Sequence, residues 1–304
     1  MKEKIIFLVG PTAVGKTEVS LHLAKKINAE IISCDSMQIY QGMDIITSKP
    51  SSAVRRRIPH HLIDLVAANL EFNAARYRLE ANRKIKEIIL RGKTPLFVGG
   101  TGLYMKILID GIFANKSRNK NIRLRLYRQA KRLGSEYLYE RLKVVDSISC
   151  SRIHPNDTKR IIRALEVFEN TGKPISELQK QRKGIAEIYD IKIFCLNTAR
   201  QELYRRIEDR VEKMFKRGLV REVNSLLKSR LSKTASCAIG IKEIKGNLEG
   251  LCCQEEAKQM MKRNTRLYAK RQLTWFRKDK NIIWIEIYDK EKPEEIAKRI
   301  YELL

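Results

Sequence analysis

A phosphate-binding loop near the start of the chain contains the first residues that could do chemistry. Residues 10–17 read Gly-Pro-Thr-Ala-Val-Gly-Lys-Thr, which fits the pattern Gly-x4-Gly-Lys-Ser/Thr. Glycines let backbone N–H groups turn inward around an anion, and the start of the next helix adds partial positive charge. Lys16 would supply a full charge and Thr17 a ligand for Mg²⁺. The residues expected to bind linked phosphates, as in ATP, are Gly10, Pro11, Thr12, Ala13, Val14, Gly15, Lys16 and Thr17.

Asp35 is the second candidate, because it follows an apparent strand over residues 30–34. An acid at the end of a strand beside a phosphate loop typically holds Mg²⁺ through water. A general base that takes a proton from a second substrate would occupy the same position. The position of Asp35 leaves both roles open.

A second glycine-rich turn, Gly-Gly-Thr-Gly over residues 99–102, follows an apparent strand over residues 94–98. It could be a tight connection in which Thr101 caps a helix. It could also present backbone and hydroxyl donors to phosphate. In open parallel sheets ligands bind at the carboxyl ends of the strands, so we expect this turn, Asp35 and the phosphate loop to share one crevice.

Strand and helix patterns alternate around these loops, which favours an α/β fold: a parallel sheet flanked by helices. The strand patterns cover residues 5–9, 30–34, 94–98 and 189–196. Strand patterns disappear between residues 113 and 184, and the pattern from residue 199 onwards is again helical. We therefore expect a core domain formed by residues 1–113 and 185–304 and a mostly helical insertion at residues 114–184.

The charge of the chain indicates a polyanionic partner. Its 62 Lys and Arg residues against 35 Asp and Glu give a net charge of +27, which favours nucleic acid. A membrane is the weaker candidate, because no apolar stretch approaches the roughly 20 residues that span a bilayer. The six cysteines show no Cys-x-x-Cys pair, so we expect reduced thiols in a cytoplasmic protein.

The positive charge is concentrated in helical segments. Residues 114–133 contain eight Lys or Arg and no acid, and Lys159 and Arg163 share one face of a helix expected to begin after residue 157. A last helical segment aligns Arg263, Arg266, Lys270 and Arg277 on one stripe. Such stripes are usually solvated surface, but cations at this period can also follow a phosphate backbone. Tyr268 and Trp275 are expected to pack, with stacking on an unpaired base as the alternative.

Six motifs occur in an order that resembles the tRNA dimethylallyltransferases, also called tRNA isopentenyltransferases, of the bacterial type. They lie at residues 10–17, 35–40 (Asp-Ser-Met-Gln-Ile-Tyr), 59–64 (Pro-His-His-Leu-Ile-Asp), 99–104, 154–166 and 269–276 (Ala-Lys-Arg-Gln-Leu-Thr-Trp-Phe). The resemblance covers nearly the whole chain. It implies a P-loop NTPase-like core and an insertion that contacts tRNA.

The resemblance also implies a reaction. A dimethylallyl group passes from its diphosphate to N6 of adenosine 37, beside the anticodon, in tRNAs that read codons beginning with U. Diphosphate is released with the help of Mg²⁺, and ATP need not be hydrolysed. The expected partners are the tRNA anticodon stem-loop and dimethylallyl diphosphate, with no obligate protein partner and a monomer as the default.

The family pattern assigns roles to individual residues. It makes Asp35 the general base, places Thr101 near the reacting centre, and gives Arg123 a contact with diphosphate or tRNA. Together with Lys16, these are the expected catalytic residues. Contacts with tRNA are implied for Asp35, Ser36, Met37, Gln38, Thr101, Arg123, Lys159, Arg160, Ile161, Ile162, Arg163, Gly240 and Lys242, to which the helical stripe adds Arg266, Lys270 and Arg277.

The chain departs from the family pattern at three positions. Val14 replaces a usual Ser, which should matter little because the backbone does most of the binding there. Ile46 replaces a usual Gly and leaves the local turn geometry open, and Ile241 replaces a usual Tyr near the expected tRNA surface.

Three other functions are considered. The first 40 residues alone would suit a P-loop small-molecule kinase, but a kinase would not require a net charge of +27. An adenylate isopentenyltransferase would use AMP or ADP as the acceptor. A nucleic-acid-binding protein without catalysis would not depend on Asp35.

Overall fold

The computed structural model describes residues 2–113 and 119–304, so residue 114, where the insertion was expected to begin, lies outside the described residues. The chain divides into two compact units. One contains Met1–Ile109 and Ile188–Leu304, and the other contains Asp110–Glu187. The first unit holds the sheet and the three loops singled out above.

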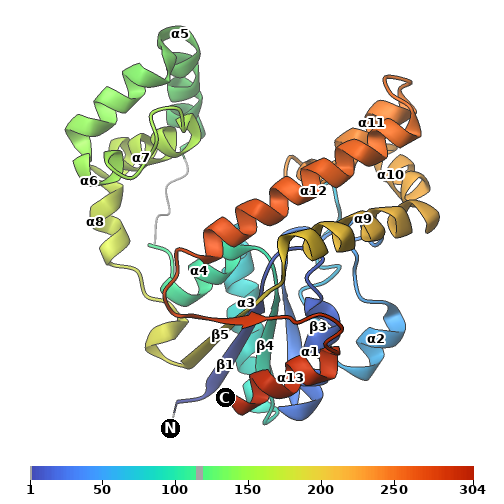
Figure 1. Cartoon of the computed structure of the whole chain (residues 1–304). Helices are drawn as coiled ribbons and strands as arrows, with labels where there is room; N and C mark the ends of the chain where they lie inside the picture. Colours follow the sequence, from blue (N-terminus) through green and yellow to red (C-terminus); the bar gives the residue numbers. More distant parts are fainter. Residues whose placement is uncertain (1, 114–118) are drawn as a thin grey trace. The chain divides into compact units, whose positions relative to one another are not determined.

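A six-stranded sheet in which every pairing is parallel forms the centre of the first unit (Figure 1). Its order is β3-β2-β4-β1-β5-β6. The strands are β1 (Lys4–Val9), β2 (Ala29–Cys34), β3 (His60–His61), β4 (Thr94–Gly99), β5 (Asp190–Asn197) and β6 (Ile282–Glu286). The α/β fold expected from the sequence, a P-loop-like parallel sheet flanked by helices, is confirmed.

The sequence reading missed two strands. The segment after residue 199 was expected to be helical throughout, which is wrong at β6. This strand lies at the edge of the sheet beside β5, and Ile282 and Ile285 are buried while Ile283 is 38% exposed. Because the two buried residues are three positions apart and lie on opposite faces of the strand, the segment lacks the two-residue alternation that identifies a half-buried strand. The other missed strand, β3, has two residues, too few to give a periodic signal.

Helices cover both faces of the sheet. On one face, Ile6 and Leu8 of β1 belong to the core that includes Leu23 of α1 (Lys16–Lys26) and Ile300 of α13 (Pro293–Glu302). Phe7 points to the other face, where its ring stacks on Phe97 with centroids 4.6 Å apart. This alternation follows from the two-residue period of a strand.

The helices α3 (Ala74–Leu90) and α4 (Gly102–Asp110) are joined through two tyrosines. The rings of Tyr77 and Tyr104 stack with centroids 3.9 Å apart. The buried Tyr77 hydroxyl donates to the carbonyl oxygen of Ser33 at 3.0 Å. This bond ties α3 to the end of β2, two residues before Asp35.

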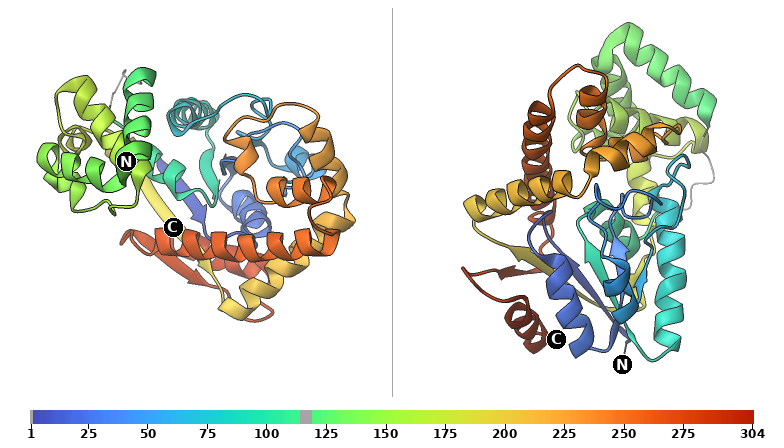
Figure 2. Two further views of the ribbon diagram at one scale, coloured as in Figure 1. Left: turned by 90° about the horizontal axis from the view of Figure 1, so that it is seen from above. Right: turned by 90° about the vertical axis from the view of Figure 1, so that its right-hand side faces the viewer.

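Two long helices, α9 (Arg200–Lys216) and α12 (Gln254–Phe276), pack against each other beyond the carboxyl ends of the strands (Figures 1 and 2). Lys262 pairs with Glu212 at 2.7 Å and Arg266 with Glu208 at 2.6 Å between them. The shorter elements of this unit are α2 (Ser52–Arg57), α10 (Leu219–Leu227), η2 (Ala235–Cys237) and α11 (Ile241–Leu248).

The described part of the second unit is helical. It contains α5 (Lys120–Val145), α6 (Ser147–Cys150), α7 (Thr158–Thr171), α8 (Ile175–Lys180) and η1 (Ile185–Glu187). Gly134, at φ +85°, interrupts α5. Leu126 and Leu142 of α5 pack with Ile161 and Leu165 of α7 in a separate core. None of the helices that the structure describes in either unit is long and apolar enough to cross a membrane.

A buried carboxylate joins β2 to its neighbours at the end of the sheet away from the loops. The Glu30 side chain is 4% exposed and accepts hydrogen bonds from Arg91 at 2.6 Å and from His61 at 2.7 Å. Burial raises the pKa of Glu30, but the bonds from Arg91 and His61 outweigh it and bring the pKa to about 2. The charged form therefore stabilises the fold.

We predict that Glu30→Gln lowers the free energy of unfolding at pH 7 by about 1–3 kcal/mol. Because the pKa of Glu30 is depressed in the folded state, its stabilisation is present above pH 4.5 and is lost as the pH falls towards 2. The difference between Glu30→Gln and the wild type should thus shrink below pH 4.5 in urea unfolding series. Glu249→Gln, which alters an exposed ion pair with Lys245 on α11, is the control, and a difference between Glu30→Gln and the wild type that does not depend on pH would contradict the prediction.

Candidate active site

The phosphate loop follows β1 directly and adopts a conformation that requires its glycines. Gly10 has φ +143° and Gly15 has φ +105°, values that favour glycine. A Cβ atom on Gly10 would lie 2.7 Å from the carbonyl oxygen of Leu196. The ammonium of Lys16 folds back over the loop and donates to the carbonyl oxygens of Gly10 at 2.9 Å and Pro11 at 2.7 Å.

Lys16 is destabilised as a cation in the free protein. Burial lowers its pKa, the neighbouring Arg210 lowers it further, and Asp35 opposes both, so that the pKa is about 8. A bound anion would restore the charged form by supplying the missing counter-charge.

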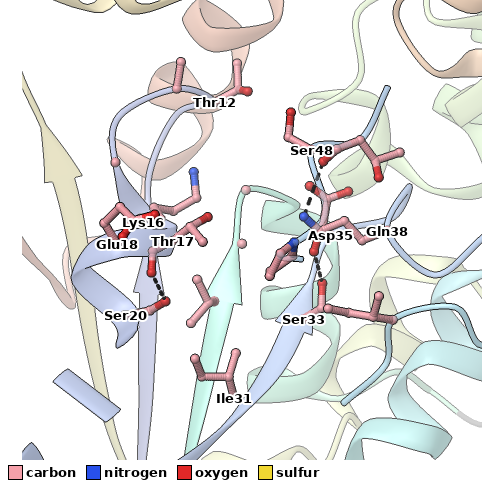
Figure 3. A pocket seen from close by; sticks show the side chains of 18 of the residues that line it. Thr12, Lys16, Thr17, Glu18, Ser20, Ile31, Ser33, Asp35, Gln38 and Ser48 are labelled. Carbon is pink, nitrogen blue, oxygen red and sulfur yellow. Dashed lines mark hydrogen bonds between the residues drawn. The ribbon is translucent and has the colours of Figure 1, made fainter. Parts of the chain in front are cut away.

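The opposite wall of the site consists of the loops after β2 and β4. The Thr101 N–H donates to the Cys34 carbonyl at 3.1 Å, and the Thr101 hydroxyl accepts from the Ser36 N–H at 3.1 Å. One oxygen of Asp35 accepts from the Met37 N–H at 2.8 Å. Figure 3 shows Asp35 and Gln38 across the cavity from Lys16 and Thr17. The structure thus brings together the phosphate loop, Asp35 and Thr101.

Two cavities meet at Asp35. The first, about 230 Å³, is lined by Lys16, Thr17 and Gln38. The second, about 300 Å³, is lined on its apolar side by Ile46, Val211, Met214 and Met261. The residues that line both cavities are Thr12, Asp35, Thr47, Arg210 and Tyr268. The carboxylate of Asp35 therefore borders two chemically different spaces.

Three site residues on helices were not found as such in the sequence. Arg210 of α9 donates to the Thr12 hydroxyl at 3.2 Å, and burial lowers its pKa while Asp35 opposes that shift. Tyr268 of α12, expected to pack, lines both cavities, and burial raises the pKa of its hydroxyl. Gln272 bonds to the phosphate loop. These residues stand in charged helical patterns, where no local signal distinguishes them from solvated side chains.

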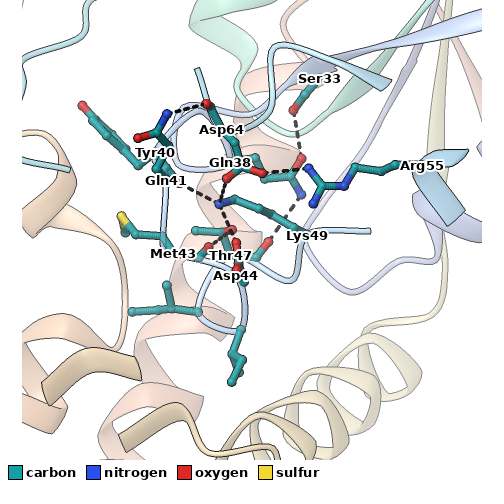
Figure 4. A network of polar contacts seen from close by, with 12 residues as sticks. Ser33, Gln38, Tyr40, Gln41, Met43, Asp44, Thr47, Lys49, Arg55 and Asp64 are labelled. Carbon is teal, nitrogen blue, oxygen red and sulfur yellow. Dashed lines mark hydrogen bonds and ion pairs between the residues drawn. The ribbon is translucent and has the colours of Figure 1, made fainter. Parts of the chain in front are cut away.

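The loop over residues 43–50 lines both cavities and is fixed by two sets of charges. Lys49, whose side chain is 2% exposed, donates to Tyr40 O at 2.6 Å and pairs with Asp44 at 2.8 Å and Asp64 at 2.5 Å (Figure 4). The Asp64 carboxylate also accepts from Arg55 at 2.7 Å. These bonds connect the loop to the 59–64 motif, whose structural role was not predicted from the sequence.

The second set centres on Glu222 of α10. Its carboxylate accepts from the N–H groups of Asp44, Ile45 and Ile46 at 3.0, 2.7 and 2.9 Å. These bonds define the turn at Ile46, whose geometry the sequence left open. The Ile46 side chain is 6% exposed and packs beside Gly240. Ile241, the other departure in this region, is buried.

The expected tRNA contacts include two side chains that cannot reach a partner. Ile161 and Ile162 are buried in the core of the second unit, so the expectation that these side chains form part of the tRNA surface is wrong. These two residues were included because the family resemblance implies contacts for the whole range 159–163, and α7 buries both of them. Lys159 is exposed on the same helix.

Other expected tRNA contacts are occupied within the chain. Arg123 and Arg163 both bond to the Glu166 carboxylate, at 2.5 and 2.9 Å. Arg160 pairs with Asp157 at 3.3 Å. Gly240 is buried and donates its N–H to Glu243 at 2.8 Å.

Five of the expected cations are exposed to solvent. They are Lys159, Arg160, Lys242, Lys270 and Arg277. Arg266 is partly buried in its pair with Glu208.

Comparison with known proteins identifies the family. The model of the IPP transferase family matches residues 38–279, and that of isopentenyl transferases matches residues 3–64. The tRNA dimethylallyltransferase of Geobacter sulfurreducens is 48% identical over 94% of this chain and 92% of its own length. The chain belongs to the tRNA dimethylallyltransferase family. The family resemblance read from the sequence, and with it the expectation of a prenyl-transferring enzyme, is confirmed.

Other relatives of this family match over almost the whole chain. The tRNA dimethylallyltransferase of Carboxydothermus hydrogenoformans is 47% identical over 99% of this chain and 97% of its own. The solved tRNA isopentenylpyrophosphate transferase of Bacillus halodurans has a TM-score of 0.72 at 38% identity, covering 99% of this chain and 96% of its own. A eukaryotic dimethylallyltransferase captured acting on tRNA has a TM-score of 0.83 at 30% identity, and the match covers 98% of this chain and 77% of that protein.

We predict that affinity for inorganic pyrophosphate falls as the pH rises through about 8, the pKa of Lys16 in the free protein. Above this pH, binding must first protonate Lys16, which weakens it by up to about tenfold per pH unit. Lys16→Arg keeps the charge without titrating in this range. Calorimetric titrations at pH 7 and 9 should show a steeper loss for the wild type, and equal losses in both proteins would contradict the prediction.

We predict that Glu222→Ala speeds amide hydrogen exchange at Asp44, Ile45 and Ile46 by about 10- to 100-fold, because each N–H loses a bond to a charged acceptor. Arg221→Ala, which removes an exposed neighbour of Glu222, should leave these amides unchanged. Amide hydrogen exchange of the two variants and the wild type, measured by NMR at neutral pH, tests this prediction. The prediction is wrong if the two variants exchange alike.

Proposed function

We propose that this chain transfers a dimethylallyl group from dimethylallyl diphosphate to N6 of adenosine 37 in tRNAs that read codons beginning with U. One observation carries the proposal: Asp35 lines both the cavity of the phosphate loop and the second, more apolar cavity. A diphosphate ester and a base that enter from different sides would meet at this carboxylate. Membership of the tRNA dimethylallyltransferase family supports the same assignment.

In the proposed reaction the N6 lone pair forms a bond to the allylic carbon, and the bond from that carbon to the diphosphate oxygen breaks. The electron pair of the broken bond leaves with the diphosphate. Lys16 and Arg210, which border the cavity of the phosphate loop, would stabilise the developing negative charge. Asp35 would accept the N6 proton through the oxygen not occupied by the Met37 N–H.

The loop and its surroundings suit Mg²⁺, the expected cofactor. The Thr17 hydroxyl would hold the ion and Asp35 lies in the same cavity, while the described residues include no cluster of three or more His, Cys, Asp or Glu that could hold a metal alone. Mg²⁺ usually keeps several waters and binds through one or two protein oxygens plus phosphate. When bound, it would neutralise charge on the diphosphate.

The proposed partner is the anticodon stem-loop of tRNA, and adenosine 37 would have to leave its stack to reach Asp35. Lys159, Lys242, Lys270 and Arg277 are exposed and could each neutralise a phosphate. Thr101 would act near the reacting centre through its hydrogen bond with Ser36, the residue after Asp35. We propose that the chain acts in the cytoplasm, as a monomer.

The transfer assay tests the proposal. Wild-type protein, dimethylallyl diphosphate, Mg²⁺ and an unmodified tRNA with adenosines at positions 36, 37 and 38 should yield N6-dimethylallyl adenosine by nucleoside mass spectrometry. Asp35→Asn should lower the transfer rate about 10²- to 10⁴-fold, the usual contribution of a general base, while tRNA binding is largely kept.

The same assay with other acceptor molecules distinguishes the proposed function from the alternative enzymes. Faster turnover on AMP than on tRNA would replace the proposal with an adenylate isopentenyltransferase, and ATP-dependent phosphorylation of a small acceptor would replace it with a kinase. Transfer that persists in Asp35→Asn at the wild-type rate would remove Asp35 from its proposed role.

A further inference from the structure

Helix α12 inserts one amide side chain between the two glycine-rich loops. Gln272 is 6% exposed. Its Oε1 accepts from the Thr12 N–H in the phosphate loop at 2.9 Å, and its Nε2 donates to the Gly100 carbonyl oxygen at 2.9 Å. A single side chain thus uses both its donor and its acceptor to bridge loops that follow β1 and β4.

The fit of this amide depends on glycine at position 100. A Cβ atom on Gly100 would lie 2.1 Å from the Gln272 amide nitrogen, a distance that no side chain tolerates. One turn of helix further on, Trp275 lies just as close to Gly102, where a Cβ atom would be 2.2 Å from its ring. The absence of side chains at Gly100 and Gly102 therefore allows α12 to pack against this turn. Neither a helix cap nor a phosphate contact, the two roles that the sequence suggested for the turn, includes this packing.

The bond from Thr12 changes how the phosphate loop is understood. Thr12 was expected to bind diphosphate, but its N–H is already paired with Gln272, and its hydroxyl accepts from Arg210 at 3.2 Å. The Thr12 N–H is thus used inside the protein, and its hydroxyl keeps only its own hydrogen to donate. A buried N–H left without its partner would cost as much as a lost hydrogen bond, so the loop keeps this conformation while Gln272 is present.

We propose that Gln272 is a positioning residue for the transfer reaction: its amide sets the phosphate loop in the conformation that receives diphosphate. This inference rests on the proposed function of the loop. Gln272 would not touch the reacting atoms. It would act through Thr12 on one side and Gly100 on the other, so that the donors following Thr12 are oriented before the ligand arrives.

The test uses Gln272→Met, which keeps the length of the side chain and removes both bonds, with Gln259→Met as the matched control. Gln259 is exposed on the same helix and bonds to Glu255. In Gln272→Met we expect the Kd of inorganic pyrophosphate and the KM of dimethylallyl diphosphate to rise about 10- to 100-fold. The KM of tRNA should stay within about twofold, and Gln259→Met should match the wild type throughout.

A second variant distinguishes positioning from general packing. Gln272→Glu keeps an acceptor for the Thr12 N–H, and at low pH its protonated carboxyl group can also donate to the Gly100 carbonyl oxygen. Its Kd for pyrophosphate, measured at low pH, should therefore fall between those of the wild type and Gln272→Met. Wild-type affinity in Gln272→Met would overturn the proposal. So would an equal rise in the KM values of both substrates, which a loosened helix predicts.

Two further outcomes are decided by the wild-type protein. If neither variant folds, amide hydrogen exchange at Thr12 without ligand decides: protection supports the Gln272 bond, and exchange at the rate of an unfolded peptide overturns it. If the wild type binds no pyrophosphate and transfers no dimethylallyl group, the proposed function fails. The Thr12 exchange then still reports whether Gln272 fixes the loop.

Discussion

The close approach of neighbouring strand ends is the constraint on which the rest of the site depends. A Cβ atom on Gly99 would lie 2.1 Å from the Cys34 carbonyl oxygen, and one on Gly10 would lie 2.7 Å from that of Leu196. Backbones this close permit the Thr101 N–H to reach the Cys34 carbonyl at 3.1 Å. The phosphate loop, Asp35 and Thr101 then lie around one cavity because parallel strands end on the same side of a sheet. Their chemistry follows from backbone geometry.

The strong positive charge of the chain has two distinct structural uses. Some cations neutralise carboxylates inside the fold, as Lys49 does with Asp44 and Asp64 and as Arg123 and Arg163 do with the buried Glu166. Others are exposed, such as Lys270 on the helix that also supplies Gln272 and Arg277 directly after that helix. A count of charges does not separate these uses, because burying an ion pair and presenting a cation require the same residue types. The net charge indicates a polyanionic partner, and the contacts show which cations are available for it.

The sequence predicted the parts of this protein that are encoded locally. The phosphate loop, the acid after β2 and the turn after β4 each lie within a few residues of a strand, so their spacing alone identified them. Arg210 and Gln272 contact Thr12 across 198 and 260 residues, and Glu222 reaches the loop at residue 45 across 177. Such bonds are set by how helices dock, and helical periodicity reports only which side of a helix is apolar. A motif taken as a continuous range has the same limitation: the range 159–163 included Ile161 and Ile162, which are both buried.

The electrostatics of the free site favour the diphosphate ligand proposed above. Burial lowers the pKa of both Lys16 and Arg210, the charge of Arg210 lowers that of Lys16 further, and Asp35 opposes these shifts only in part. The site therefore carries excess positive charge that water and protein dipoles do not fully stabilise. A diphosphate supplies several negative charges at the phosphate loop and removes this cost, whereas a neutral ligand would leave it in place. In the proposed reaction the same excess would favour the state in which negative charge accumulates on the departing diphosphate, so the interaction that binds the ligand would also promote breaking of its bond.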